Sequence, residues 1–351
     1  MARGHKEEED TEFDRVPGLD HPRETFELIG QDDALRIAAT AIRGGRPPQG
    51  LLLCGPPGSG KATLAYRIAR YLLKYGASDA GPADLWVPRD DPVSLRVLAR
   101  AHPGLLVLTR GLHPDTGKPM TVLSVNEIRK LANFFGLTSG AGGWRIAIID
   151  PADEMNDQAA NALLKALEEP PARSILLLLS HAPGRLLPTI RSRCQMLRLQ
   201  PLPSTVLAHE LAERQPHLSE EERDAVVQLS AGSLGLALML AQGDGLVIAK
   251  ESQRLIDSAA DPDLLELFAL ADRVGRLKDG LAILGEDLIL NLSARIAARA
   301  RAGGPALNSW VEAWEKLRHA FGRSATLHLE PRQTILSASA VLSEAARSGN
   351  L

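Results

Sequence analysis

A glycine-rich stretch followed by a lysine is the first feature of this sequence that could do chemistry. The stretch GPPGSGKAT begins at Gly55 and contains Gly58, Ser59, Gly60 and Lys61. An apolar run precedes it and an apolar helical pattern follows it, which is the context that a phosphate-binding loop needs. Glycines let backbone N–H groups surround phosphate oxygens, and the lysine reaches the outer phosphates. The motif therefore predicts a nucleotide-binding loop.

The residue after this lysine departs from the usual phosphate-loop pattern. A Ser or Thr is expected there, because its hydroxyl binds Mg²⁺, and this chain has Ala62. Thr63 comes next, but one residue turns a helix by about 100°, so its hydroxyl should face elsewhere. We therefore expect nucleotide to be held by the backbone and Lys61, with hydrolysis impaired.

An aspartate at the end of the apolar run RIAIID is the candidate second element of the site. Asp150 should lie at the carboxyl end of a buried strand, where ligands collect in open α/β sheets. ATPases of this kind usually continue with a water-orienting Glu, but Pro151 follows here, and the spacing of Asp153 and Glu154 is wrong for that role. The alternative is that Asp150 only caps the next turn. The departures at Ala62 and Pro151 together predict a site that binds nucleotide without turning it over.

Alternating strands and helices must position these residues. The apolar patterns predict strands at 49–54, 104–108, 145–150 and 174–180, and helices at 62–73, 124–135 and 157–169. Strands separated by helices imply a parallel sheet that is covered on both faces. Beyond about residue 203 the patterns are helical only. We expect a mobile tail over 1–20, an α/β core over 21–203, a small helical unit over 204–245 and a second helical domain over 246–351.

Composition excludes several functional classes. The chain has 351 residues and a net charge of -3, so it lacks the overall basic field of many nucleic-acid binders and any DNA contact should be local. Its two cysteines, Cys54 and Cys194, cannot form a structural zinc site alone. No apolar run reaches membrane-spanning length, and the N-terminus is too charged for a signal peptide. These features favour a cytoplasmic protein without a metal site or a membrane contact.

Four stretches together resemble the clamp-loader branch of the AAA+ ATPases, and within it the delta-prime family. In chain order they are IGQDDA, GPPGSGKATLA, IIDPADEMNDQAANALLKALEEPP and LPTIRSRCQ. The resemblance covers about residues 22–200 and implies a P-loop AAA+ core, with 204–245 as a helical lid and 246–351 as a helical collar that assembles a ring. It implies that ATP or ADP binds without turnover. It implies no zinc, because residues 74–103 replace the four-cysteine zinc module of many relatives.

The same resemblance implies partners and one residue that acts on a neighbour. The family forms a pentameric ring with gamma/tau motor subunits and a delta subunit, and it loads a sliding clamp onto primer-template DNA during replication. A delta-prime member is largely static and largely non-hydrolytic, and it gives the Arg of a Ser-Arg-Cys motif, here Arg193, to the ATP site next to it. A guanidinium is permanently charged and forked, which suits γ-phosphate. Residue type alone favours a surface ion pair for Arg193, and only the motif around it favours the finger; Arg191 is the other candidate.

Other functions remain open at this point. An active motor ATPase of the gamma/tau kind would need the residues that Ala62 and Pro151 replace, and the stretch GSLGLAL lacks the sensor arginine of motor subunits. A P-loop nucleotide kinase would need an acceptor pocket, which nothing after residue 200 suggests. Ser180 could bind a phosphate or simply be satisfied at its strand end. Lys165 and Arg191 could touch DNA phosphate or lie on solvated helix faces.

Overall fold

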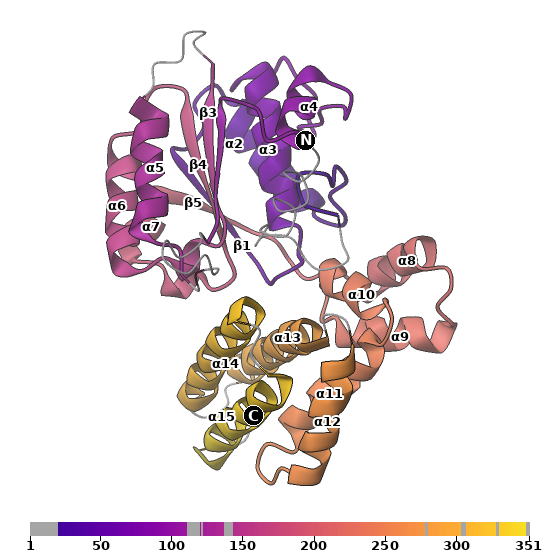
Figure 1. The fold of residues 1–351 in the computed structure, drawn as a ribbon. Coiled ribbons are helices and arrows are strands. Elements are labelled where there is room, and N and C mark those ends of the chain that lie inside the picture. The colour runs from indigo at the N-terminus through magenta and orange to yellow at the C-terminus, as the bar shows by residue number, and fades with distance from the viewer. Residues whose placement is uncertain are drawn as a thin grey trace, which may run out of the picture. The chain divides into compact units, whose positions relative to one another are not determined.

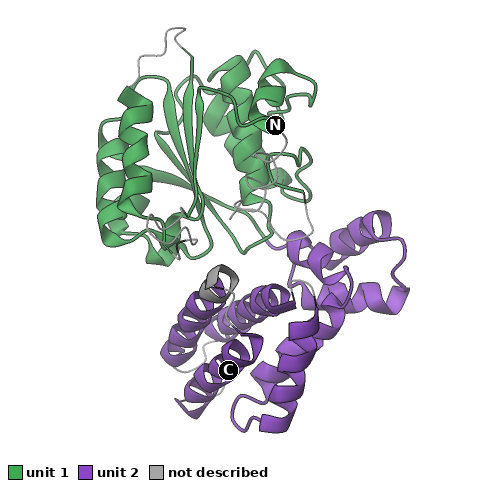
Figure 2. Ribbon diagram, viewed as in Figure 1, with its two compact units in different colours: residues 1–16, 20–200 green, residues 17–19, 201–351 purple. Residues whose placement is uncertain are grey.

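The computed structural model describes residues 20–110, 120, 122–136, 143–277, 280–302, 307–327 and 330–348. Apart from Asp20, the expected tail over 1–20 lies outside the described residues. The described chain divides into two compact units, residues 20–200 and residues 201–351 (Figure 2). The first unit contains the sheet, and the second contains helices.

A five-stranded parallel sheet forms the centre of the first unit. Its order is β2-β3-β4-β1-β5, so the strand before the phosphate loop has a neighbour on each side. At least one helix separates consecutive strands, as parallel pairing requires. The predicted parallel α/β core is confirmed. The strands are β1 (Gly50–Cys54), β2 (Leu105–Leu108), β3 (Arg145–Ile149), β4 (Ser174–Ser180) and β5 (Cys194–Arg198).

Helices cover both faces of this sheet (Figure 1). Alternate residues of a strand point to opposite faces, so Leu51 and Leu53 pack toward α2 and α3, while Leu52 and Cys54 pack toward α6 and α7. The sequence patterns missed α2 and α4, which lie beside α3. The helices of this unit are α2 (Asp32–Arg43), α3 (Lys61–Tyr75), α4 (Pro92–Leu98), α5 (Val125–Gly136), α6 (Asp157–Glu168) and α7 (Pro188–Arg193).

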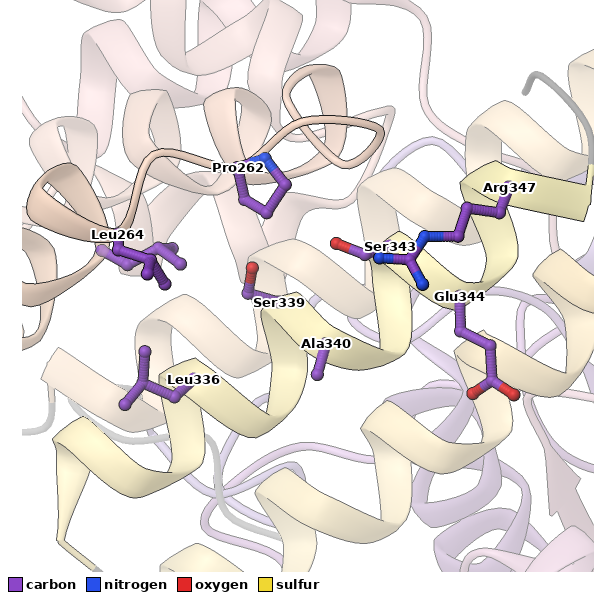
Figure 3. Close-up of a pocket in the computed structure, with 9 residues that line it drawn as sticks. Pro262, Leu264, Leu336, Ser339, Ala340, Ser343, Glu344 and Arg347 are labelled. Carbon is purple, nitrogen blue, oxygen red and sulfur yellow. The ribbon is translucent and has the colours of Figure 1, made fainter.

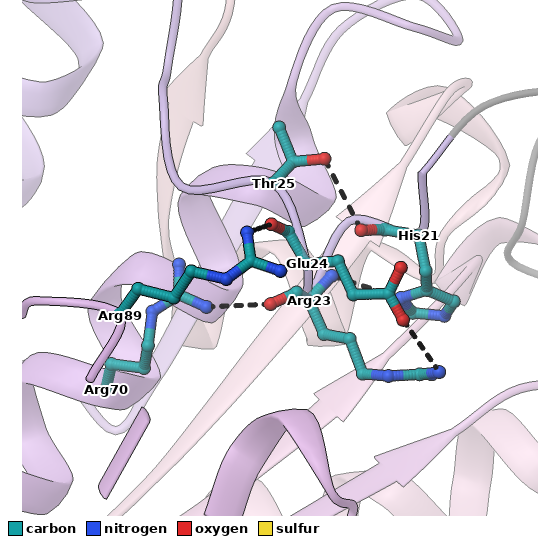
Figure 4. Close-up of polar contacts among 6 residues, drawn as sticks. All are labelled: His21, Arg23, Glu24, Thr25, Arg70 and Arg89. Carbon is teal, nitrogen blue, oxygen red and sulfur yellow. Dashed lines mark hydrogen bonds and ion pairs between the residues drawn. The ribbon is translucent and has the colours of Figure 1, made fainter. Parts of the chain in front are cut away.

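Arg70 of α3 and the nearby Arg89 contact the segment over residues 21–26, and Figure 4 shows the polar contacts among them. The Arg70 guanidinium donates to the carbonyl oxygen of Arg23 at 3.1 Å and lies 4.1 Å from the centre of the Phe26 ring. Arg89 lies over the same ring, 5.5 Å from its centre. Cation–π contacts of this kind strengthen when the cation is withdrawn from water, and Arg70 is only 1% exposed. The segment that leads toward the phosphate loop is therefore held firmly.

The regular elements of the second unit are all helices among its described residues. Its helices are α8 (Ser204–Arg214), α9 (Glu220–Leu229), α10 (Leu234–Leu240), α11 (Gly245–Asp257), α12 (Leu264–Arg276), α13 (Gly280–Arg301), α14 (Asn308–Leu327) and α15 (Pro331–Ser348). The two tryptophans of α14 take part in helix packing: Trp310 is buried in the core of this unit, and the Trp314 indole donates to the Ile289 carbonyl at 3.1 Å. The separation of this unit into a lid and a collar stays a prediction.

Side-chain caps begin two of the helices. The Ser219 hydroxyl accepts from the Glu222 backbone N–H at 3.3 Å and the Glu222 carboxylate accepts from the Ser219 N–H at 2.9 Å, which completes a capping box at the start of α9. The Asn156 side chain accepts from the Ala159 N–H at 2.8 Å and starts α6. Within the described part of the chain, every helix is too short or too polar to span a bilayer.

Candidate nucleotide-binding site

The phosphate loop joins the end of β1 to the start of α3, as predicted. Gly58 and Gly60 have φ of +69° and +91°, a backbone region that residues with a Cβ rarely adopt. Gly60 is also the residue that caps α3, so the loop delivers the chain to a helix N-terminus. A Cβ at Gly60 would lie 2.9 Å from Leu28, which packs against the loop from the segment before α2. The loop has the backbone shape that phosphate binding needs.

Lys61 bridges the loop from its first helical position. Its ammonium donates to the carbonyl oxygens of Gly55 at 2.9 Å and Pro56 at 2.7 Å, and the residue is 4% exposed. Burial lowers the pKa of Lys61 to about 8, while the nearby charges of Asp150 and Asp153 oppose this decrease. A phosphate group would add to the negative charge that stabilises this buried ammonium.

Two carboxylates act on this lysine from the end of β3. Asp150 is the predicted one, and its backbone N–H pairs with the Leu108 carbonyl at 3.0 Å. The second is Asp153, which is 5% exposed and accepts from the His181 backbone N–H at 3.0 Å. Its distance along the chain from Asp150 predicts only that Asp153 does not orient water. A short 3₁₀ turn (Ala152–Glu154) brings it back to the sheet edge, which spacing alone does not reveal.

Two buried hydroxyls near the loop lack hydrogen-bond partners among the described residues. They are Ser59 Oγ in the loop and Ser180 Oγ at the end of β4. Ser180 is fully buried, it pairs in register with Cys54, and its carbonyl accepts from the Gly55 N–H at 3.2 Å. Buried polar atoms normally find partners, and phosphate oxygens would supply them here. The residues of this edge therefore fit the phosphates of a nucleotide.

The position after Lys61 does not fit a magnesium ligand. Ala62 is half-buried against the core between α3 and the sheet, and Thr63, the only adjacent hydroxyl, is buried in the helix. A bound nucleotide would be held by loop N–H groups, Lys61 and Ser59. Its phosphates would bring the charge that attracts Mg²⁺, but the chain offers no hydroxyl at the usual place.

Residues 74–103, the segment expected in place of a zinc module, contact α3. Both cysteines lie in the sheet, and no cluster of three or more His, Cys, Asp or Glu side chains suited to a metal occurs among the described residues. Polar contacts hold the corresponding segment against α3 instead. Arg67 pairs with Asp84 at 2.9 Å, and the Tyr71 hydroxyl donates to the Ser78 carbonyl at 2.7 Å.

Arg193 lies beside the amino ends of the strands, opposite the end of the sheet that carries the phosphate loop. It ends α7, and the next residue, Cys194, pairs in register with Gly50 at the start of β1. The phosphate loop follows Cys54, at the far end of that strand. Four residues of strand span about 13 Å, so Arg193 and Lys61 do not belong to one site within this chain. Its guanidinium pairs with the Glu168 carboxylate at 2.8 Å, so the ordinary ion pair considered above is present as well.

Arg198 is a basic residue at the carboxyl edge that sequence analysis missed. It pairs in register with Cys54 and its side chain is exposed. Burial raises the pKa of the Cys54 thiol to about 11, and the charges of Arg198 and Lys61 oppose this increase. The thiol is therefore unreactive, while the edge carries a second cation beside the phosphate loop.

A pocket in the helical unit is a separate feature (Figure 3). It has a volume of about 310 Å³ between α12 and α15. Its lining is mostly apolar and contains none of the predicted site residues, so it gives no reason to move the candidate site from the sheet edge. The lining residues are Pro262, Leu264, Leu267, Leu336, Ser339, Ala340, Ser343, Glu344 and Arg347.

A family model and several curated proteins match part of this chain. The family model described as DNA polymerase III, delta subunit, matches residues 30–203. The chain is 38% identical over 183 residues to the delta' subunit of DNA polymerase III from Pseudomonas aeruginosa, covering 52% of each chain. It is 33% identical over 209 residues to that of Escherichia coli, covering 58% of each chain. The chain thus spans about half the length of the curated relatives it matches.

A solved structure resembles the chain more loosely. A DNA polymerase III gamma subunit-related protein from Thermotoga maritima is 18% identical, with a TM-score of 0.41 and coverage of 90% of this chain and 98% of the other.

Proposed function

Residues 30–203 belong to the DNA polymerase III delta-subunit family, and from this premise we propose that the chain is a delta-prime-type subunit of a bacterial clamp loader. It would occupy a ring with gamma/tau and delta subunits and help them load a sliding clamp onto primed DNA. Its own loop would hold ATP or ADP without turning it over. Arg193 would complete the ATP site of a neighbouring motor subunit.

The position of Arg193 is the observation that carries this proposal. Arg193 lies at the amino edge of the sheet, while Lys61 and the phosphate loop lie at the carboxyl edge, about 13 Å of strand away. An arginine so far from its own nucleotide loop can meet γ-phosphate only in another subunit. Its side chain is 38% exposed, so a neighbouring molecule can reach it.

The composition of the loop supports the non-hydrolytic part of the proposal. Ala62 supplies no magnesium-binding hydroxyl, and Pro151 supplies no carboxylate to orient water. The backbone cradle, Lys61 and the unpartnered hydroxyl of Ser59 still suit the binding of phosphate. The chain retains the features for binding and lacks two that serve hydrolysis.

Arg193→Ala in the loader reconstituted with the other subunits of its own cell tests this function. We expect the ring to assemble and its clamp- and DNA-stimulated ATPase to fall by the contribution of one site, because an arginine finger is worth about 10³ or more in rate. Arg191→Ala, two residues away, is the matched control and should leave the ATPase intact. Full ATPase in a ring that contains the Arg193→Ala variant would refute the proposal.

An active motor ATPase is the rival function, and the isolated chain distinguishes it. We expect no Mg²⁺-dependent ATP hydrolysis by the purified chain, with or without clamp and primed DNA. Turnover that disappears in Lys61→Ala would instead assign the chain to the motor class. Co-purification of the chain from its native cell with the other loader subunits and the clamp would test the proposed partners directly.

A further inference from the structure

The guanidinium of Arg193 is held at two points rather than free. One terminal nitrogen donates to the carbonyl oxygen of Thr189 at 3.1 Å, one turn back on α7. The other lies 2.8 Å from the Glu168 carboxylate at the end of α6. Guanidinium has five N–H donors in a fixed plane, so two anchors fix the plane and still leave donors for a third partner.

Core packing fixes the relative positions of Glu168 and Arg193. Each is the chain neighbour of a buried residue: Leu167 precedes Glu168, and Cys194 follows Arg193. A Cβ at Gly50 would lie 2.7 Å from Cys194 Sγ and 2.8 Å from Leu167 Cδ2, so both side chains meet β1 at the same point. The end of α6 and the start of β5 are thus clamped together, which makes the pairing a consequence of the fold.

From this contact we infer that Glu168 is a positioning residue for Arg193, and the inference rests on the function proposed above. A free arginine side chain samples many rotamers, and ordering it is costly. With Glu168 and Thr189 as anchors, Arg193 is oriented before a neighbour's phosphate arrives. The two side chains of the ion pair are 38% and 50% exposed, and exposed pairs are worth at most about fivefold in population. The carboxylate therefore orients the arginine without trapping it.

Glu168→Gln in the reconstituted loader tests the inference. Loss of the carboxylate should lower the rate at the neighbouring ATP site by roughly threefold to fivefold, because the guanidinium loses one of its two anchors. The decrease in the total ATPase of the ring should then be about two-thirds or more of the decrease that Arg193→Ala causes. The KM for ATP and the melting temperature should stay unchanged, and Glu168→Asp, which keeps the charge, should restore part of the rate.

The adjacent Glu169 supplies the matched control. Its side chain is exposed and has no ion pair or hydrogen bond among the described residues, so Glu169→Gln makes the same charge change and should leave the ATPase intact. In the Arg193→Ala background, Glu168→Gln should have no further effect. Equal losses in both backgrounds, or no loss in either, would overturn the positioning role. If the Arg193→Ala variant keeps full ATPase, the proposed function itself is refuted. Failure of the positioning role and failure of the proposed function are therefore distinguishable.

Discussion

Lys61 shows how a single residue can be prepared for an anion. Its ammonium is buried among carbonyl oxygens and near two carboxylates, and its pKa is nevertheless lowered to about 8 because burial outweighs these favourable charges. A phosphate group beside it would raise that pKa again. Nucleotide binding at about pH 8 should therefore be accompanied by proton uptake, since the free site holds the lysine partly neutral.

That coupling gives a calorimetric prediction. If ATP or ADP is titrated into the chain at pH 8 in buffers of different ionisation enthalpy, the observed heat should vary with the buffer and report uptake of a fraction of a proton. At pH 6.5 the lysine is already charged, so its contribution to the proton uptake should vanish, and only the ionisation of the terminal phosphate should remain. Lys61→Met should remove both binding and the buffer dependence. If the heat of binding at pH 8 is the same in all buffers, Lys61 does not take up a proton when nucleotide binds, and the prediction is wrong.

Ala62 yields a second prediction at the residue scale. Ala62→Thr restores the hydroxyl expected beside Mg²⁺ and should tighten ATP binding by about tenfold, the value of one hydrogen bond to a charged group. The gain should require Mg²⁺ and disappear with chelator present, which serves as the internal control. Hydrolysis should still be absent, because Pro151 remains. Turnover by Ala62→Thr alone would show that the residue after Asp150 matters less than expected.

The elements of the α/β unit could be predicted well, and the reason is physical. Buried parallel strands such as 174–180 are unbroken apolar runs, and glycine, proline and capping residues mark their ends, so the core strands and the helices between them follow from local pattern. The helices α2 and α4 were missed. α2 begins immediately after the IGQ stretch without a side-chain cap, and α4, although Asp91 caps it and Pro92 is its first residue, has only seven residues.

The arrangement of the site could be predicted only in part. The loop glycines, Lys61 and Asp150 form a local signature that the sequence carries. The position of Arg193 depends on strand order, because β5 pairs with the start of β1, and no spacing in the chain encodes that. The contact of Glu168 with Arg193 likewise joins residues that are separated by a whole strand and helix.

Asp287 on α13 gives a prediction at the scale of packed helices. It is fully buried, and burial raises its pKa to about 7, while the nearby polar side chains of Ser252 and Asn291 act in the opposite direction. The unfolded carboxyl titrates near 4, so the folded state binds the proton more tightly. Stability should therefore fall as pH rises from about 4 to about 7, by up to about 4 kcal/mol, and stay low above that range.

Asp287→Asn removes this titration and keeps the shape of the side chain. The free energy of unfolding, measured by urea denaturation across this pH range, should be higher for the variant than for the native chain at pH 8, and the difference should shrink toward pH 4. A mutation of the exposed Asp261 to Asn is a control that should leave the pH profile of the native chain unchanged. A constant difference at all pH values would show that Asp287 is charged in the folded state.

At the scale of the whole molecule, the two units have separate hydrophobic cores. One core lies on both faces of the sheet, and the other joins α11 to α15. The family match ends at residue 203, close to where the first unit ends. The family match and the candidate chemistry therefore concern the first unit, and the predicted assembly role of the second unit depends on its own stability.

Separate cores predict separate responses to damage. Leu288 of α13 is fully buried in the helical core, and Leu288→Ala should cost about 2–5 kcal/mol there. Hydrogen exchange measured by mass spectrometry should then accelerate in α11–α15 and stay slow in β1, β3 and β4. Leu177→Ala, at an equally buried position of β4, should do the reverse. Hydrogen exchange in α8 and α9 shows whether residues 204–245 form a unit of their own. If α8 and α9 stay protected in Leu288→Ala, the predicted lid is favoured. If their exchange accelerates together with that of α11–α15, the helical part unfolds as a single cooperative unit.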